Sequence, residues 1–419
     1  MPPTPVPALN AEQILARLEK LGIRLGLESV RQLLAGFGNP QLHYRTVLVA
    51  GSNGKGSTSA LLAAMASAAG LKTGLYTSPH LESVEERLRI DGRAIHPEEL
   101  AALLKRIVEA ESPTYFEAVT AAAFLWFSER QVDLAVIEVG MGGRLDATNV
   151  CEPELSLITS ISLEHREHLG DTLAAIAREK AGTFRPGRPA LVWLEDPEPS
   201  AAVRAVAAEL GTDLHFAPEL VTLRQDGNRV RLTTPKGEHD LELTLPGAHQ
   251  ARNLALAVLA AEELGIGPEA IAEGARSCRW PGRLERVDLP GDRQVLLDAA
   301  HNPEGAAALA AFLKGPFDLL FGVLGDKDVA EMLGPLAERA RRIVLTTPAS
   351  DRARSPEELA TLLPGREVEI VPDLGQALDR ALQPGVRLVV CGSIYLIGEV
   401  RKRLRERFGV PQPANGPLY

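Results

Sequence analysis

The feature that most constrains the fold of this chain is a glycine-rich turn between an apolar run and a helical segment. The stretch VAGSNGKGSTSALLAAM (49–65) follows the β-rich run TVLVAG (46–51) and opens a helix expected over 55–69. A strand, a flexible turn and a helix in this order direct backbone N–H groups and a helix N-terminus at one point, where an anion can bind. The unit therefore predicts a phosphate site beyond the carboxyl end of a parallel strand.

The turn nevertheless departs from the common phosphate-loop pattern G-x-x-x-x-G-K-[ST]. Position 49 is Val where the first glycine would stand, and Gly56 separates Lys55 from the hydroxyl of Ser57. Gly51, Gly54 and Gly56 would still let the backbone approach a phosphate, and Lys55 would add a positive charge for its β/γ oxygens. A glycine-rich turn with a solvated lysine is the simpler alternative. The combination of glycines, lysine and hydroxyls favours phosphate binding.

The chain up to residue 283 alternates strand-like and helix-like segments. Apolar runs lie at 72–78, 133–140, 155–161 and 189–193, and those at 133–140 and 155–161 are continuous, as expected for strands buried on both faces of a parallel sheet. Helices are predicted at 97–109, 115–130 and 172–182. Between 219 and 246, apolar and polar residues alternate around an Asp-Gly and a Lys-Gly pair, which predicts an antiparallel hairpin before a helix resumes at 252.

A second alternating series begins near Leu284. Its predicted strands are 294–300, 318–325, 341–348, 367–372 and 386–393, with helices between them. The segment WPGRLERVDLPGDR (280–293) is rich in Pro, Gly and charge and is the best candidate for a domain boundary. We therefore expect two α/β domains, 1–283 and 284–419, each around a mostly parallel sheet. The first is of the phosphate-loop ATPase type with a small antiparallel hairpin region, and the second is Rossmann-like.

Composition excludes several classes of function. The 419 residues carry a net charge of −10, which argues against a nucleic-acid partner because such proteins usually present a basic face. The three cysteines have no metal-ligand spacing and suggest a reducing compartment. The N-terminal residues MPPTPVPALN do not have the pattern of a signal peptide, and the longest apolar stretch is too short to span a bilayer. We expect a cytoplasmic protein with no membrane partner.

Polar residues gather where the predicted elements end. Ser78, in YTSPHL, has a hydroxyl that could bind a hard cation, although a Ser-Pro pair alone usually marks a turn. Glu138 ends a wholly apolar strand, where an unpaired carboxylate is costly, so a cation or metal should neutralise it; a capped turn is the alternative. His165 follows another buried strand, which favours a ligand or catalytic role over a surface position. Lys180 lies near the end of a helix, where a lysine ordinarily complements the helix dipole.

Short motifs spread from about Leu25 to Glu399 point to a known family. In chain order they are VAGSNGKGS, YTSPHL, TYFEAVT, EVGMGGRLDATN, EKAG, LPGAHQARN, WPGR, LDAAHNPEG, GDKD and CGSIYLIGE. Each is weak alone, but together and in this order they resemble folylpolyglutamate synthase. The bacterial form of that enzyme often doubles as dihydrofolate synthase and belongs to the Mur ligase superfamily.

The resemblance implies amide-bond formation driven by ATP. A carboxylate, on a pteroate or on the glutamate tail of a folate, attacks the γ-phosphate and becomes an acyl phosphate, which the amine of L-glutamate then attacks. The transferring phosphoryl group carries spread negative charge, so Mg²⁺, lysine and backbone N–H donors must surround it. The implied cofactors are ATP and two Mg²⁺ ions, and a requirement for K+ stays open. The expected partners are folate or dihydropteroate, L-glutamate and ATP, and we expect a monomer.

The resemblance also implies roles for individual residues. The nucleotide-binding set is Gly54, Lys55, Gly56, Ser57, Asn253, Arg283, Asp298, His301 and Asn302. The magnesium ligands are Ser78, Glu138 and His165, and Lys180 matches a lysine that CO₂ carbamylates; with Lys55 these supply the catalytic groups Lys55, Lys180, His165 and Glu138. The folate or pteroate pocket is matched by Arg24, Leu25, Gly26, Thr114, Tyr115, Phe116, Glu117, Leu145, Asp146 and Ala147. ATP would thus be shared between the domains, and their closure would complete the site.

Some residues depart from the family pattern, and other functions stay open. Glu164 precedes His165 where the family usually has Asp, and the loop begins GSN where GTN is commoner. The pair Tyr115-Phe116 suits a flat ring system by stacking, although two core aromatics of a helix are an equal alternative. The rival functions are a Mur-type ligase that builds cell-wall peptides and a nucleotide-binding switch protein.

Overall fold

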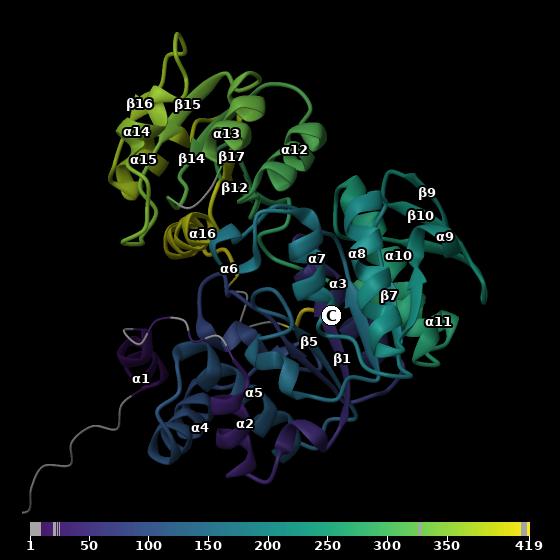
Figure 1. The fold of residues 1–419 in the computed structure, drawn as a ribbon. Helices are drawn as coiled ribbons and strands as arrows, with labels where there is room; N and C mark the ends of the chain where they lie inside the picture. Colours follow the sequence, from purple (N-terminus) through teal and green to yellow (C-terminus); the bar gives the residue numbers. More distant parts are fainter. Residues whose placement is uncertain (1–9, 20–21, 23, 25, 326–327, 412–416) are drawn as a thin grey trace, which may run out of the picture.

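The computed structural model describes residues 10–19, 22, 24, 26–325, 328–411 and 417–419, and builds them around three sheets. The sheets have eight, three and six strands. Figure 1 shows the first two in the lower and right-hand body of the molecule and the third in a separate lobe above them. Leu25 lies outside the described residues. The predicted α/β class with two mostly parallel sheets is confirmed.

The eight-stranded sheet has the order β4-β3-β2-β5-β1-β6-β7-β8. Its strands are β1 (Arg45–Ala50), β2 (Thr73–Tyr76), β3 (Leu88–Ile90), β4 (Arg93–Ala94), β5 (Leu134–Glu138), β6 (Leu155–Ile158), β7 (Pro189–Val192) and β8 (Asp213–Phe216). All neighbouring strands are parallel except the short β3 and β4, which extend one edge antiparallel. β1 lies between β5 and β6, so the glycine-rich turn that follows β1 is flanked by the ends of two other parallel strands.

Helices cover both faces of this sheet. They are α1 (Ala11–Leu18), α2 (Glu28–Ala35), α3 (Lys55–Ala68), α4 (Pro97–Ala110), α5 (Tyr115–Glu129), α6 (Arg166–Leu169), α7 (Leu173–Ala181), α8 (Pro197–Leu210), α9 (Ala217–Leu220), α10 (Ala248–Glu263) and α11 (Pro268–Ser277), with 3₁₀ turns η2 (Pro40–Leu42), η3 (Val84–Arg87) and η4 (Ala147–Val150). In β1, Val47 and Val49 pack with α3, α10 and α11, whereas Leu48 and Ala50 belong to the core with α1, α2, α4, α5, α7 and α8. Because successive strand residues point to opposite faces, a strand covered on both sides has to be apolar throughout.

The predicted hairpin region is a three-stranded antiparallel sheet in the order β11-β10-β9. Its strands are β9 (Thr222–Asp226), β10 (Arg229–Thr234) and β11 (Gly237–Glu242). In β10 the residues alternate between exposed and buried, and the buried ones pack in the same core as α10 and α11. The Asp-Gly and Lys-Gly pairs stand at the two turns, so the region has one strand more than a single hairpin.

The six-stranded sheet has the order β12-β13-β17-β14-β15-β16. Its elements are β12 (Glu285–Leu289), β13 (Arg293–Leu297), α12 (Pro303–Phe312), β14 (Phe317–Phe321), α13 (Val329–Ala337), β15 (Arg342–Leu345), α14 (Pro356–Thr361), β16 (Glu369–Ile370), α15 (Leu374–Ala381), β17 (Arg387–Cys391) and α16 (Ile394–Phe408). Only β12 is antiparallel to its neighbour, and it lies inside the segment 280–293 that the sequence marks as a boundary. The connection between the two bodies is therefore confined to the residues just before Glu285.

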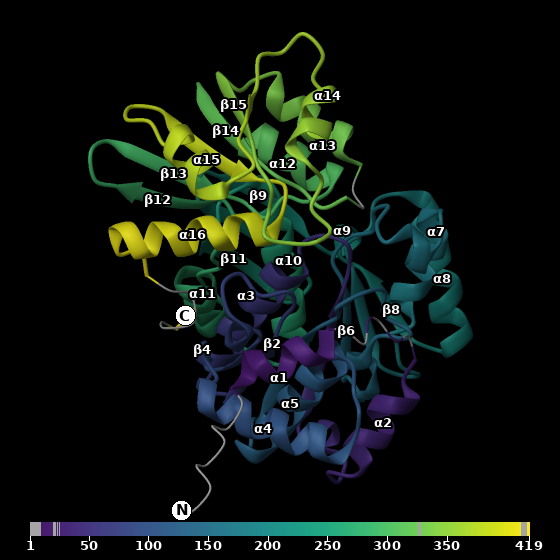
Figure 2. The same cartoon turned by 90° about the vertical axis from the view of Figure 1, so that its left-hand side faces the viewer.

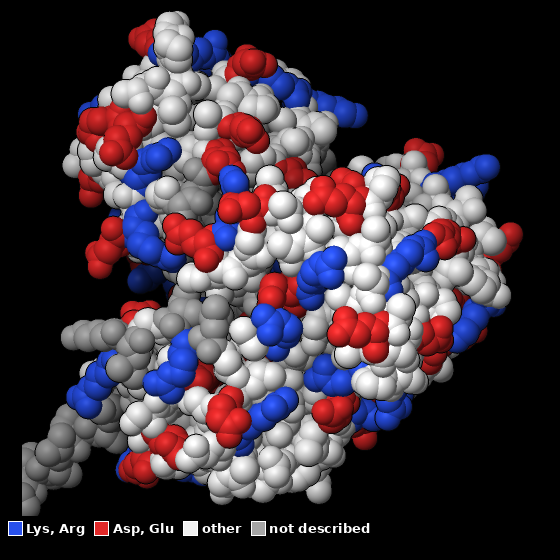
Figure 3. Space-filling model, viewed as in Figure 1, with Lys and Arg blue, Asp and Glu red and all other residues white. Residues whose placement is uncertain are grey.

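The two bodies of the chain also touch away from this connection. Helix α16 lies along the boundary between them in both views (Figures 1 and 2). The backbone N–H of Leu418 donates to the carbonyl of Gly92, which places the last described residues against the eight-stranded sheet. Acidic and basic side chains are interspersed over the face shown in Figure 3. Within the part of the chain that the structure describes, no helix has the length and apolar character needed to cross a membrane.

Candidate active site

A cleft of about 380 Å³ lies between the two bodies, where the parallel strands of the large sheet end. Residues after β1, β2, β5, β6 and β7 line one side of it. The opposite side comes from 298–301 and from α12, on the six-stranded sheet. Residues predicted to bind a nucleotide thus meet in one cavity although they are far apart in the chain.

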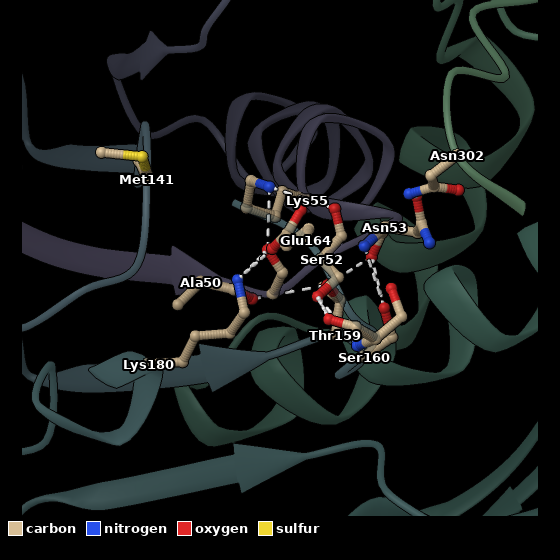
Figure 4. Close-up of polar contacts among 12 residues, drawn as sticks. Ala50, Ser52, Asn53, Lys55, Met141, Thr159, Ser160, Glu164, Lys180 and Asn302 are labelled. Atoms are coloured by element: carbon tan, nitrogen blue, oxygen red, sulfur yellow. Dashed lines mark hydrogen bonds and ion pairs between the residues drawn. The ribbon is translucent and has the colours of Figure 1, made fainter. Parts of the chain in front are cut away.

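The glycine-rich turn lines this cleft, and hydrogen bonds from Lys55 and from residues after β6 hold its conformation (Figure 4). Lys55 Nζ donates to the carbonyl oxygens of Gly51, at 2.8 Å, and of Ser52, at 3.2 Å. The hydroxyl of Thr159 donates to the carbonyl of Asn53, and the Asn53 N–H donates to Ser160 Oγ. A nucleotide phosphate would find the turn already ordered, with the N-terminus of α3 facing it.

Neighbouring side chains lie against two glycines of the turn, and the first of them could not be replaced without strain. Gly54, at the N-cap of α3, has a φ of 86°, and a Cβ there would stand 2.4 Å from Asn253 Oδ1. A Cβ on Gly56 would lie 3.1 Å from ring atoms of Trp280, which precedes the connection between the bodies. The indole ring of Trp280 therefore packs against Gly56, the glycine that departs from the common loop pattern. This packing links the phosphate-binding turn to the interdomain connection.

Lys180 and Glu164 form a buried ion pair beside the turn. Lys180 Nζ lies 2.6 Å from Glu164 Oε1 and 2.8 Å from the carbonyl of Gly51, and only 1% of its side chain is exposed. Burial and the nearby charge of Lys55 lower the pKa of Lys180, against the opposing effect of Glu164. Burial alone would raise the pKa of Glu164, but Lys180 and Lys55 hold it below its ordinary value. Lys180 does lie in the last turn of α7, as the helix-dipole interpretation requires, but its ammonium group is buried and paired with Glu164.

The three predicted magnesium ligands all line the cleft. Glu138 is buried and accepts a hydrogen bond from the backbone N–H of Ser78 at 3.1 Å. Burial raises the pKa of Glu138, and Lys55 and Arg283 partly offset the effect. His165 is the N-cap residue of α6, has a positive φ of 44° and is exposed. A carboxylate and a hydroxyl facing a phosphate-binding turn are a donor set that suits Mg²⁺, which binds one or two carboxylates together with substrate phosphates.

Among the described residues no three His, Cys, Asp or Glu side chains are grouped closely enough to hold a metal by themselves. A cation in the cleft would therefore take part of its coordination from the Ser78 hydroxyl and from the phosphates of the nucleotide. The residues present fit such a shared site.

The six-stranded body contributes Asp298, His301 and Asn302 to the site. Asp298 is buried and accepts hydrogen bonds from the N–H groups of Leu284 and Ala300. Burial raises its pKa, and Arg283 partly offsets this. His301 lines the cleft, whereas Asn302 lies outside its lining and donates to Asn53 Oδ1 at 2.8 Å. This hydrogen bond connects the six-stranded body directly to the phosphate-binding turn.

The residues predicted for a folate pocket form a separate group, and Leu25 among them lies outside the described residues. Arg24 stands 3.9 Å from Glu117, and the Gly26 N–H donates to the Leu145 carbonyl. Thr114 caps α5 through the Glu117 N–H, and the Arg87 guanidinium lies 5.2 Å from the centre of the Tyr115 ring.

This group meets the cleft at Gly140. Phe116 packs against Gly140, where a Cβ would lie 2.4 Å from its ring, and Asp146 Oδ2 approaches the same position. Asp146 also caps η4, which Ala147 begins. Tyr115 and Phe116 are half-buried, so they are neither fully exposed nor simple core residues. Of this whole set, none lines the cleft directly within the described part of the chain.

Comparison with known proteins follows the same division of the chain. One family model, described as the Mur ligase middle domain, matches residues 49–261, and another, described as the Mur ligase, glutamate ligase domain, matches 282–394. Escherichia coli FolC in complex with DHPP and ADP is 32% identical, covers 96% of this chain and 100% of its own, and superposes with a TM-score of 0.88. A bifunctional folylpolyglutamate synthase/dihydrofolate synthase of Yersinia pestis, complexed with AMPPNP and Mn ion, is 33% identical over 96% of this chain and 100% of its own, with a TM-score of 0.86.

The chain belongs to the folylpolyglutamate synthase/dihydrofolate synthase family of the Mur ligase superfamily. A Haloferax volcanii relative, described as a probable bifunctional folylpolyglutamate synthase/dihydropteroate synthase, is 38% identical over 94% of this chain but only 50% of its own length. The chain therefore spans about half the length of that curated relative.

In this member of the family, several residues that line or support the cleft were not predicted. Asn53, Thr159 and Ser160 organise the phosphate-binding turn, and His249 and Arg252 line the cleft beside Asn253. Their motifs, GSN, ITSIS and GAHQARN, stand in the sequence, but among these residues only Asn253 has a predicted role. Small hydroxyl and amide residues at strand ends are common, and only the hydrogen bonds to the turn single these out.

Proposed function

We propose that this chain is an ATP-dependent ligase that joins L-glutamate to a folate, and also to dihydropteroate, through an acyl-phosphate intermediate. The observation that carries the proposal is the shared cleft, in which the phosphate-binding turn, the buried carboxylate of Glu138 and the residues around Asp298 face one another. A phosphate donor and a second substrate can meet there with water displaced. Family membership supports the same activity.

In the proposed mechanism the turn and Lys55 hold the ATP phosphates. Lys55 would exchange its two carbonyl contacts for oxygens of the β and γ phosphates, and Asn253, Arg283 and Asp298 would contact the remainder of the nucleotide. Ser78, Glu138 and His165 would hold magnesium. When bound, this ion supplies positive charge that stabilises the transferring phosphoryl group. The folate carboxylate attacks the γ-phosphorus, ADP leaves, and the glutamate amine then displaces phosphate from the acyl carbon.

We further propose that Lys180 is carbamylated in the active enzyme. The depressed pKa of the buried amine supports this, because only a neutral amine attacks CO₂, and one proton leaves as the N–C bond forms. The resulting carboxylate would replace a positive by a negative charge beside the turn and help hold a second magnesium ion. Glu164 would lose its present partner in that state, since it pairs with the ammonium form at 2.6 Å.

Four other assignments belong to the proposal. We assign ATP and folate binding to a domain of residues 1–283 and the glutamate ligase function to a domain of 284–419. The cluster around Arg24, Tyr115, Phe116 and Asp146 would bind the pteridine part of the folate, with a stacking role for the aromatic pair. The three free, buried cysteines support a reducing, cytoplasmic location. We also propose a monomer.

An assay of ADP release tests the reaction. The purified chain is given Mg·ATP and L-glutamate, with tetrahydrofolate, dihydropteroate or a cell-wall peptide precursor added in separate reactions. We expect ADP release only with the folate or the pteroate. Release with the cell-wall precursor alone, or release that no second substrate stimulates, would contradict the proposal and favour another Mur-type ligase or a switch protein.

Two variants test the assigned residues. Ser78→Ala should raise the magnesium concentration that half-saturates the reaction, and an unchanged value would transfer the metal-binding role to Ser57. Lys180→Ala should be inactive and should recover activity when short carboxylic acids are added, because these can occupy the place of a carbamate. Full activity of Lys180→Ala without any addition would rule out an essential carbamate.

A further inference from the structure

A buried ion network joins the segment after β2 to the last helix of the chain. The Glu82 carboxylate pairs with Arg401 at 2.6 Å and with Arg405 at 3.1 Å, and Arg401 also pairs with Glu285 at 3.0 Å. Only 2% of the Glu82 side chain and 5% of the Arg401 side chain are exposed. Glu82 comes from the eight-stranded body, whereas Arg401 and Glu285 come from the six-stranded one. Charges buried this deeply hold their positions, because separating them leaves an unpaired ion in a dry site.

The backbone beside this network is packed without spare room. A Cβ on Gly398, in α16, would lie 1.9 Å from the carbonyl oxygen of Leu81. The Leu81 side chain in turn fills the space beside Gly282, together with Ile397. Gly282 precedes Arg283 in the connection between the bodies, and its N–H donates to Glu285. Leu81 therefore packs closely between helix α16 and the connection between the two bodies.

The other end of the same segment reaches the proposed metal site. The Ser78 N–H donates to the Glu138 carboxylate at 3.1 Å, three residues before Leu81. At the far end of this segment the N–H groups of Leu81 and Glu82 donate to the carboxylate of Glu86, at 3.0 and 2.9 Å. Segment 78–82 is thus a short arm that hydrogen bonds hold at both ends. One end of the arm carries a proposed magnesium ligand, and the other end lies in the contact between the bodies.

We propose that Leu81, Glu82, Gly398 and Arg401 are positioning residues for magnesium. Their contact sets the place of the Ser78 hydroxyl relative to Glu138, so that the metal affinity of the cleft depends on how α16 is seated against the first body. The inference rests on the proposed function, because it uses Ser78 and Glu138 as metal ligands. The inference also explains why residue 398, in the motif CGSIYLIGE, is glycine: a larger residue would leave no space for the Leu81 carbonyl.

The test compares two alanine substitutions in helices of the six-stranded body. Gly398→Ala inserts a methyl group against the Leu81 carbonyl without changing any charge. Gly375→Ala, in α15, is the matched control, because its methyl would meet mainly the flexible end of Arg403, which lies on the same helix α16. Magnesium is titrated at fixed ATP, and the readout is the ATP-dependent rise in melting temperature, which needs no folate.

For Gly398→Ala we expect the half-saturating magnesium concentration to rise about tenfold, the usual scale for losing a group that orients a metal ligand. Gly375→Ala should keep the wild-type value. Glu82→Gln is a second variant for the case that Gly398→Ala does not fold; it keeps the side-chain shape, leaves Arg401 its pair with Glu285, and should shift the same titration in the same direction.

The inference is overturned if folded Gly398→Ala and Glu82→Gln both titrate like wild type, or if Gly375→Ala shifts as far as Gly398→Ala. A wild-type protein with no magnesium-dependent response to ATP overturns it as well. A wild type that responds to Mg·ATP but shows no folate-dependent ADP release contradicts the proposed reaction and leaves the positioning inference standing. The two failures are therefore distinguishable.

Discussion

Replacing Lys180 with methionine should destabilise the ligand-free protein strongly, because it leaves the Glu164 carboxylate buried without its ion-pair partner, and the charges of Lys55 and His165 offset it only in part. Lys180 and Glu164 are 1% and 9% exposed, and their charged atoms lie 2.6 Å apart. Removing one partner of a buried pair costs about 3–5 kcal/mol. Methionine keeps most of the volume of the lysine stem, so loss of packing contributes little to that figure. Loss of the charge therefore dominates the expected effect.

A double-mutant cycle with Glu164→Gln isolates the pair. The two single variants should each be destabilised, and the double variant should recover part of the loss, giving a coupling energy of about 2–3 kcal/mol. Arg204 and Glu219 supply the control pair: they lie 2.8 Å apart, but their side chains are 55% and 64% exposed. Their cycle should give about 0–1 kcal/mol.

Urea unfolding followed by tryptophan fluorescence measures both cycles. All three tryptophans, Trp126, Trp193 and Trp280, precede residue 283, so the signal reports on the body that holds both pairs. A coupling energy for Lys180 and Glu164 no larger than that of the control pair would refute the reasoning, because it would mean that water reaches the pair and screens it.

Three further substitutions or conditions follow from the site. Glu138→Gln should raise the melting temperature of the ligand-free protein, since burial raises the pKa of Glu138 and an amide oxygen can still accept from the Ser78 N–H. The same substitution should remove the magnesium-dependent response to ATP. Melting curves with and without Mg·ATP check both results. Gly54→Ala should cost about 1–3 kcal/mol and abolish ATP binding in a calorimetric titration, because of its positive φ and the approach of Asn253. Lys180 and Lys55 lower the pKa of Glu164 in the folded protein. This carboxylate therefore contributes stability above its unfolded pKa of about 4.5, and the contribution is lost as the pH falls from there through the folded pKa. Glu164→Gln should flatten the acid side of the stability curve in urea titrations at several pH values.

The fold was largely predictable because its signals are local. The apolar runs at β5 and β6 and the turn after β1 are legible within a few residues each, and the structure has strands there. The predicted strands are mostly too long: the run 367–372 contains only Glu369–Ile370 as β16. Strands β3, β4, β8 and β12 were missed because they have only two to five residues each.

The site was only partly predictable, because its decisive contacts join distant parts of the chain. The sequence around Lys180 does not show that Glu164 will pair with it, since helix α6 and most of α7 separate the two residues. Glu82 and Arg401 stand 319 residues apart, and each alone resembles an ordinary surface charge. Likewise, nothing near Gly56 shows that Trp280 will lie on it. Spacing identifies which residues share an element, whereas pairing between elements follows from how the sheets and helices pack.

The two carbonyl contacts of Lys55 have a consequence for how fast a nucleotide can bind. In the ligand-free chain the Lys55 ammonium group donates to the carbonyl oxygens of Gly51 and Ser52, within the turn itself. A phosphate that binds does not have to order the turn. Only the Lys55 side chain has to change its rotamer, which takes nanoseconds rather than milliseconds. Rearrangement of the turn should therefore not be the slow step of nucleotide capture.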